Sequence, residues 1–299
     1  MSARLTLLVL SSTTHNDTYT THNAQHITVQ DMRISVIIPS YKPGDYIWHC
    51  LESLRHQTLA KDAFDVTIVL NGCGEPYLSL LKEGIGRYSE LTVRLLHTEQ
   101  GGVSNARNLG LGASEGEFVC FVDDDDWVSP TYLEHLLTGA GAGRIVAANV
   151  WDSEETTGQL RPDYITKAYE GLKPKGTVGL VEGRSFMSSS CCKLIPRELI
   201  GTTRFDTRFA LSEDALFMAA LSHRVREIRL ASEDCIYYRR VRQTSASQAS
   251  RLQRLQKSAR VACAFAALFL AHPFRYNPLF FSTRILASLR KGLQRSWNN

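Results

Sequence analysis

Four consecutive aspartates, Asp123–Asp126, are the residues of this 299-residue sequence best suited to chemistry. They follow the apolar segment 118–122 directly and precede Trp127, which anchors them at the end of a predicted buried strand. In an extended backbone alternate residues point to the same side, so Asp123 and Asp125 can face one hard divalent cation. A solvated acidic turn is the alternative. The apolar flanks favour a site for Mg²⁺ or Mn²⁺, completed by water and substrate phosphate.

Two other polar segments end predicted strands in the same way. Pro39-Ser40-Tyr41 closes the β-branched run that begins at Ile34, and Asn71-Gly72 closes the run 66–70. In open α/β sheets ligands bind at the carboxyl ends of the strands, near a switch in strand order. The three polar segments therefore predict one site at a single edge of the sheet.

An alternation of strands and helices must position these segments. Strands are predicted over 34–38, 66–70, 91–96 and 117–122. Helices are predicted from Pro43, over 76–85 and over 104–113. This alternation implies right-handed βαβ units and an α/β fold, with a Rossmann-like, mainly parallel mixed sheet and flanking helices. Residues 1–32 are expected to be a poorly ordered extension, and 152–180, rich in Gly and Pro, a long mobile loop or subdomain.

The composition excludes several classes of protein. A hydrophobic fraction of 43% rules out a disordered chain, and no collagen-like repeat is present. The longest charge-free apolar run, 261–274, is shorter than the roughly 20 residues of a membrane-spanning helix. Seven cysteines form no CxxC pair and no zinc spacing, as is typical of a reducing compartment. Residues 5–10 are too short for a secretory signal, so we expect a cytoplasmic protein.

Positive charge is concentrated near the C-terminus. From Cys235 to Asn299 there are twelve Lys or Arg and no Asp or Glu, although the net charge of the chain is only +4. Two basic amphipathic helices are predicted within 248–299. Their basic side chains are expected on the solvent side: Arg251, Arg254, Lys257, Arg260, Arg284, Arg290, Lys291 and Arg295. The apolar faces either dock on the core or lie on an anionic membrane surface, and both interpretations stay open.

A search for rival motifs finds no Walker A loop, no HExxH and no GxSxG. Four segments in order resemble the signatures of family 2 glycosyltransferases with the GT-A fold: SVIIPSY at 35–41, GVSNARNLG at 102–110, FVDDDD at 121–126 and SED at 212–214. The resemblance covers roughly residues 33–247. It implies a GT-A catalytic domain with a nucleotide-sugar-binding half, 33–150, and an acceptor half, 151–247, followed by the helical tail 248–299.

The resemblance also implies roles for the matching residues. Asp123 and Asp124 would contact the donor, with Asp123 toward the ribose, and Asp125 would hold the metal. Arg107 would approach the base or the diphosphate. Asp214 would be the general base that takes a proton from the acceptor hydroxyl. From the residues alone, Asp214 could equally be negative charge at a helix N-terminus, and Arg107 a surface arginine.

The nucleotide base would be lined by Pro39, Ser40 and Tyr41. Family members usually carry one or two aspartates after the second strand, whereas this chain has Asn71, which can still donate to and accept from a base edge. Further contacts to the diphosphate or the acceptor are expected from Asp126, Trp127, Glu213, Arg239 and Arg242.

The resemblance implies an inverting, metal-dependent glycosyltransferase (EC 2.4 type). It would move a sugar from a nucleotide-diphosphate donor to a hydroxyl acceptor, in bacterial-type surface polysaccharide or glycan synthesis. The acceptor would be a glycan or a lipid-linked molecule at the inner membrane face, where the enzyme would be peripheral. One alternative is a nucleotidyltransferase acting on sugar phosphates, for which only Lys42 supplies charge after the first strand. Another is a non-enzymatic module that binds an anionic surface; nucleic acid is not expected as a partner.

Overall fold

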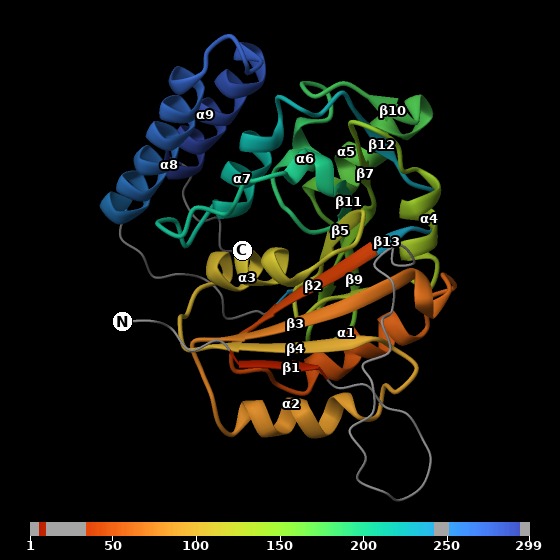
Figure 1. The fold of residues 1–299 in the computed structure, drawn as a ribbon. Helices are drawn as coiled ribbons and strands as arrows, with labels where there is room; N and C mark the ends of the chain where they lie inside the picture. Colours follow the sequence, from red (N-terminus) through yellow and green to blue (C-terminus); the bar gives the residue numbers. More distant parts are fainter. Residues whose placement is uncertain (1–5, 10–33, 242–250, 294–299) are drawn as a thin grey trace, which may run out of the picture.

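The computed structural model describes residues 6–9, 34–241 and 251–293 (Figure 1). Arg242 lies outside the described residues, as does most of the expected extension 1–32. No strand is predicted for that extension. Strand β1 (Thr6–Val9), which pairs antiparallel with β4, is therefore an addition to the expected sheet.

In the described part of the chain a nine-stranded sheet has the order β1-β4-β3-β2-β5-β11-β7-β12-β10. Its parallel part consists of β4 (Val93–Thr98), β3 (Phe64–Asn71), β2 (Ile34–Ser40) and β5 (Phe118–Phe121). Every residue of β2 and β3 is buried, as their continuous β-branched runs predict for strands covered on both faces. The four predicted strands are confirmed.

The second half of the sheet is mixed. Strand β11 (Lys193–Pro196) lies antiparallel between β5 and β7 (Arg144–Ala147). Strand β12 (Glu227–Leu230) runs parallel to β7, and β10 (Thr177–Val178) closes the edge. The sheet is therefore continuous across the expected boundary near residue 150.

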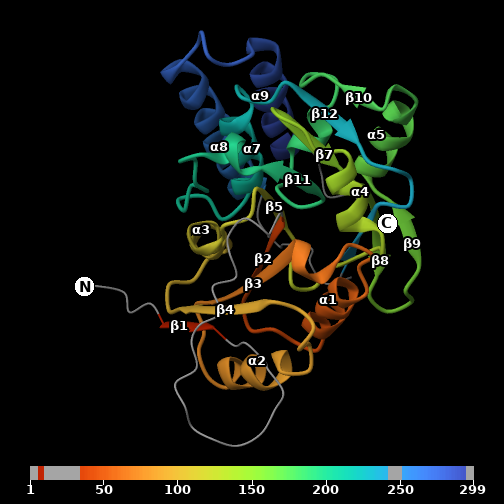
Figure 2. The ribbon, with the colours of Figure 1, turned by 45° about the vertical axis from the view of Figure 1, so that its right-hand side comes forward.

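Helices cover both faces of the parallel strands. Helix α3 (Val103–Ala113) lies on one face, and α1 (Tyr46–Arg55) packs beside α2 (Tyr77–Ile85) on the other (Figures 1 and 2). The remaining short helices are α4 (Tyr132–Thr138), α6 (Arg197–Ile200), α7 (Glu213–Leu221) and 3₁₀ turns at Lys61–Ala63, Lys173–Lys175 and Arg184–Met187. The three helices predicted in the first half are confirmed.

The region 152–180 is more regular than its Gly and Pro content predicts. It contains the end of β8 (Asn149–Glu154), β9 (Leu160–Pro162) and α5 (Tyr164–Leu172), and β8 and β9 join β13 (Ile236–Val241) and β6 (Trp127–Val128) in a second sheet. Helix α5 begins with a capping box in which the Asp163 side chain accepts from backbone N–H groups, while the Thr166 hydroxyl accepts from the Asp163 N–H. The expectation of a long mobile loop is thereby corrected.

The two predicted C-terminal helices, α8 (Arg251–Ala271) and α9 (Pro278–Leu293), are present and form a hairpin in which α8 packs on α7 (Figure 1). Phe265, Phe280 and Phe281 are at most 1% exposed at this contact. The apolar side of the hairpin therefore docks on the rest of the described fold. In the part of the chain that is described, no helix combines the length and apolar character needed to cross a membrane.

Candidate active site

The three polar segments that end β2, β3 and β5 meet at one cleft of about 710 Å³. The cleft lies at the carboxyl ends of these parallel strands, where the strand order predicts a ligand site. Its lining includes the residues predicted to bind the donor and the metal, namely Pro39, Ser40, Tyr41, Asn71, Arg107, Asp123, Asp124 and Asp125, together with Glu213.

Side chains connect the loops around the cleft. Ser40 Oγ donates to Asp124 Oδ2 at 2.6 Å. Asn71 donates through Nδ2 to the Ser40 carbonyl at 2.7 Å and accepts from the Gly102 N–H at 2.9 Å. Because Asn71 is only 2% exposed, its amide chiefly fixes the loop after β2 and the loop before α3 on one wall of the cleft. This is a structural use of the residue that replaces the family's usual aspartate.

Gly72 permits the loop after β3 to approach the loop after β4. Its φ is +65°, and a Cβ there would lie 2.7 Å from the Cα of Gly101. A side chain at this position would therefore both strain the backbone and push apart the two strand-end loops.

The last of the four aspartates points away from the cleft. Asp126 is 4% exposed, accepts from the Tyr237 hydroxyl at 2.7 Å and accepts from the Arg240 N–H at 2.8 Å. Burial, together with Asp123 and Asp125, raises the pKa of Asp126 well above its usual value. Tyr237 also accepts from the Asp123 N–H at 3.1 Å. The expected ligand contact of Asp126 is corrected to a structural one, which fixes the aspartate turn on β13.

Arg107 occupies the centre of the acidic cluster. It is 3% exposed, and its guanidinium donates through Nη2 to Asp123 at 2.8 Å and through Nη1 to Asp214 at 2.6 Å and Glu213 at 3.3 Å. Burial alone would lower the pKa of Arg107, but Asp123 and Asp214 raise it well above its usual value. The arginine therefore joins the predicted donor site to the predicted general base, two segments more than 90 positions apart in the sequence.

Asp214 lies at the start of α7 and has two further donors. Ser190 Oγ donates to Oδ1 at 2.8 Å and Ser189 Oγ donates to Oδ2 at 3.2 Å. The loop that carries both serines is held by Lys193, which is 1% exposed and donates through Nζ to the Ser189 carbonyl at 2.6 Å. The carboxylate is thus held in one orientation by donors on α3 and on the loop that carries the two serines.

Glu213, next to Asp214, faces the cleft with its side chain 12% exposed. Burial raises its pKa, and the neighbouring negative charge of Asp214 adds to the effect. Glu213 lines the cleft, so a contact with a diphosphate or an acceptor stays a prediction. Its carboxylate is already paired with Arg107 at 3.3 Å.

Two other predicted contact residues lie elsewhere. Trp127 stacks between His49 and Tyr238 and lines a separate hollow of about 470 Å³. Arg239 is paired with Asp152 at 2.6 Å and with Asp163 at 2.8 Å. Both are corrected from ligand contacts to structural positions, because their side chains are engaged along the second sheet.

The acidic residues of the cleft supply only part of a metal site. Among the described residues, no group of three or more His, Cys, Asp or Glu side chains is arranged to hold an ion unaided. Asp123, Asp124 and Asp125 nevertheless supply carboxylate oxygens to one cleft. A hard divalent cation such as Mg²⁺ is commonly bound by one or two carboxylates with the rest of its ligands from water and phosphate. The donor set fits a cation that arrives with a substrate phosphate.

Several site residues are absent from the sequence-based prediction. Ser189, Ser190 and Lys193 support Asp214, yet they belong to no motif, and no signal in the sequence links them to the site. Tyr237 lies within the span 33–247 of the family resemblance but in none of its four segments, and its contact with Asp126 is visible only in three dimensions.

Comparison with known proteins relates this geometry to a family. EpsH of Bacillus subtilis, a putative glycosyltransferase, is 30% identical over 214 residues, which is 69% of this chain and 60% of EpsH. TarS of Staphylococcus aureus, named a poly(ribitol-phosphate) β-N-acetylglucosaminyltransferase, is 37% identical over 103 residues, 34% of this chain and 18% of TarS. The chain thus spans about 60% of the length of EpsH and much less of TarS.

Solved structures share the fold. TarS 1–349 in complex with UDP-GlcNAc superposes with a TM-score of 0.67 at 22% identity, covering 87% of this chain and 72% of that chain. The mannosyltransferase PcManGT from Pyrobaculum calidifontis, in complex with GDP-Man and Mn²⁺, gives 0.60 at 16% identity, covering 87% and 73%. These likenesses confirm the predicted α/β, GT-A-type fold. A family model described as glycosyl transferase family 2 matches residues 35–202, more than half of the sequence, and the chain therefore belongs to this family.

Proposed function

We propose that this protein is a metal-dependent, inverting glycosyltransferase that moves a sugar from a nucleoside diphosphate to an acceptor hydroxyl. The observation that carries the proposal is Arg107, whose one guanidinium contacts Asp123 in the cleft and Asp214 beside it. Nucleotide sugars bound in TarS and PcManGT support such a donor for the cleft. Membership of glycosyl transferase family 2 favours this reaction over the nucleotidyltransferase alternative.

Charge supports a cation at the cleft. The single positive charge of Arg107 faces the three carboxylates of Asp123, Glu213 and Asp214, so the cluster is negative before a diphosphate enters. Like charges at this separation repel unless a cation lies among them. We assign Asp125 as the residue that holds Mn²⁺ or Mg²⁺, with Asp123 and Asp124 toward the donor. When bound, such an ion stabilises the negative charge that develops on the leaving diphosphate.

The transfer step places Asp214 as general base. The acceptor oxygen forms a bond to the anomeric carbon of the sugar while the bond from that carbon to the diphosphate oxygen breaks. Asp214 takes the hydroxyl proton, and the nucleoside diphosphate departs with the bonding electron pair. Attack opposite the leaving group inverts the anomeric configuration. Arg107 and Ser190 orient the carboxylate for this transfer.

We further propose a glycan or polymer acceptor and a peripheral membrane location. The name of TarS, which specifies poly(ribitol-phosphate), supports a polymeric acceptor. Exposed apolar side chains at the turn of the α8–α9 hairpin, Leu270, Phe274 and Leu279, lie beside the basic Arg275 and support contact with an anionic bilayer.

A panel of UDP-, GDP-, dTDP- and CMP-sugars with Mn²⁺, assayed for release of the nucleotide, tests the proposal. We expect one donor class to be hydrolysed slowly without acceptor, and we expect Asp125→Ala to lose this activity while melting within about 2 °C of the wild type. Asp62→Ala, which changes an exposed aspartate outside the cleft, is the matched control and should keep full activity. Release of nucleotide by Asp125→Ala at the wild-type rate would refute the metal assignment.

A further inference from the structure

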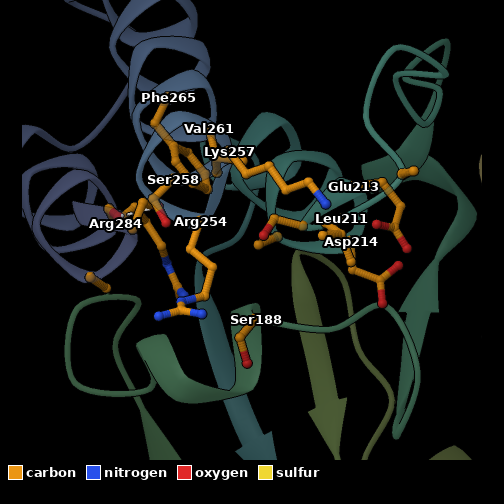
Figure 3. Close-up of a pocket in the computed structure, with 15 residues that line it drawn as sticks. Ser188, Leu211, Glu213, Asp214, Arg254, Lys257, Ser258, Val261, Phe265 and Arg284 are labelled. Atoms are coloured by element: carbon orange, nitrogen blue, oxygen red, sulfur yellow. Dashed lines mark hydrogen bonds between the residues drawn. The ribbon is translucent and has the colours of Figure 1, made fainter. Parts of the chain in front are cut away.

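A second cavity, of about 560 Å³, lies between the start of α7 and the C-terminal hairpin (Figure 3). Asp214 lines this cavity but not the donor cleft, Arg107 lines the donor cleft but not this cavity, and Glu213 lines both. The proposed general base therefore stands where the two cavities adjoin. A group bound in the second cavity can present a hydroxyl to Asp214 from the side opposite the donor.

One face of α8 points into this cavity. Arg254, Lys257, Ser258, Val261 and Phe265 line it at the three- and four-residue spacing of a single helical stripe. The expectation that Arg254 lies on the solvent side is corrected here, because its side chain is half-buried, whereas Lys257 is exposed as expected. The face of α8 toward α7 carries both basic and apolar side chains. The helical pattern in the sequence assigns them to opposite faces, which is why it does not predict this arrangement.

Arg284 of α9 is also corrected from a solvent position. It is 9% exposed, its Nη2 donates to the Arg184 carbonyl, and its Nε has no hydrogen-bond partner among the described residues. Burial lowers its pKa to about 10, so the guanidinium remains charged at neutral pH. No carboxylate in the described chain forms an ion pair with it. A buried, charged and incompletely bonded guanidinium is costly unless an anion completes its contacts.

Two guanidinium groups converge from the two helices, whereas the lysine points to the other side of the cavity. In Figure 3 the guanidinium groups of Arg254 and Arg284 reach toward Ser188, and the ammonium of Lys257 extends toward Glu213 and Asp214. The planar fork of an arginine matches two oxygens of a phosphate group. The hydroxyl of Ser188 already donates to the Ser185 carbonyl at 2.6 Å, so the two arginines are the donors at this end of the cavity. Val261 and Phe265 form an apolar wall alongside.

We propose that this cavity is the acceptor subsite and that it binds a phosphate group carried by the acceptor, through Arg254 and Arg284, with Lys257 adding positive charge on the side of Asp214. The proposal rests on the glycosyltransferase function proposed above and adds the chemical class of the second substrate. The phosphate fixes the acceptor so that a neighbouring hydroxyl lies at Asp214. It can belong to a soluble phosphate ester or to a lipid-linked one.

Calorimetry with glycerol 1-phosphate as probe, and glycerol as its uncharged control, tests the subsite directly. We expect the wild type to bind the phosphate ester and not glycerol. The double variant Arg254→Gln/Lys257→Gln should bind it at least tenfold more weakly. The double variant Arg260→Gln/Arg290→Gln removes the same charge from exposed positions outside the cavity and should bind within twofold of the wild type.

Flotation with phosphatidylglycerol and phosphatidylcholine vesicles distinguishes the source of the phosphate. If only Arg254→Gln/Lys257→Gln loses binding to phosphatidylglycerol vesicles, the phosphate is lipid-linked. If all forms bind the vesicles equally, while this variant still binds glycerol 1-phosphate more weakly, the phosphate belongs to a soluble ester. Equal binding of glycerol 1-phosphate by both double variants, or no binding by any form, would overturn the subsite. Titrations with UDP and GDP, run in parallel, measure binding at the donor cleft. Absence of nucleotide binding there would argue against the proposed function, whatever the result with glycerol 1-phosphate.

Discussion

Replacement of Arg107 by methionine tests the connection between the donor cleft and the general base. Methionine matches the aliphatic part of the arginine side chain, but it removes the only cation that contacts Asp123, Glu213 and Asp214 in the described structure. Removing one partner of a buried ion pair costs about 3–5 kcal/mol. Because the side chains of Asp123 and Asp214 are 38% and 17% exposed, water can reach both carboxylates. We therefore expect the lower end, about 3 kcal/mol.

The assay is thermal unfolding followed by circular dichroism. For a chain of this size about 3 kcal/mol corresponds to a fall in melting temperature of roughly 6–12 °C. Arg161→Met is the matched control: Arg161 is 61% exposed and pairs with Glu154, and such a surface pair contributes at most about 1 kcal/mol. Arg107→Lys should fall between the two, since one ammonium cannot bridge Asp123 and Asp214 as the guanidinium does.

A double-mutant cycle isolates the pairwise contact. If Arg107 is held chiefly by Asp214, the combined loss in Arg107→Met/Asp214→Asn should be smaller than the sum of the two single losses. A melting temperature of Arg107→Met within about 2 °C of the wild type would refute the structural role of the arginine. Strictly additive losses would refute its coupling to the base.

Three further outcomes follow from the same structure. Asp214→Asn should bind donor with wild-type affinity by calorimetry and lose transfer by about 10²–10⁴-fold, the usual contribution of a general base; unimpaired transfer would remove that role. The raised pKa of Glu213 means that its contribution to stability is present below its unfolded pKa of about 4.3 and is lost as the pH rises through the folded value. The free energy of unfolding, measured by urea titration from pH 4 to 7, should therefore fall further for the wild type than for Glu213→Gln, and parallel profiles would contradict this. Phe274→Glu should weaken flotation with phosphatidylglycerol vesicles, whereas Leu80→Glu, at an exposed position on α2, should not; equal flotation would argue against insertion of the hairpin turn.

The sequence predicts the frame of the site because that frame is local. Strands such as 34–38 and 66–70 are continuous apolar runs that can only be buried, and the polar residues that end them, Ser40 and Asn71, must then lie at one edge. The Asp163 capping box is just as local, and an aspartate three residues before a threonine is a signal that the Gly and Pro content of 152–180 obscures.

The contacts inside the site are not local and could not be predicted in the same way. Arg107 meets Asp214 across 107 positions, and Asp126 is turned from the cleft by Tyr237, 111 positions away. The faces of α8 and α9 depend on where the hairpin docks. Arg284 is buried because Phe280 and Phe281 on the same helix pack against the body, which a pattern within one helix does not reveal.

The central claim is that a divalent cation, held by Asp125 at the end of β5, contributes to binding of the donor diphosphate. The most direct test is calorimetric titration of the preferred nucleoside diphosphate into the wild type and Asp125→Ala, with Mn²⁺ and with a chelator. The account predicts at least tenfold tighter binding with Mn²⁺ for the wild type and no effect of Mn²⁺ for Asp125→Ala. Equal affinity for the wild type with the ion and with the chelator would contradict it.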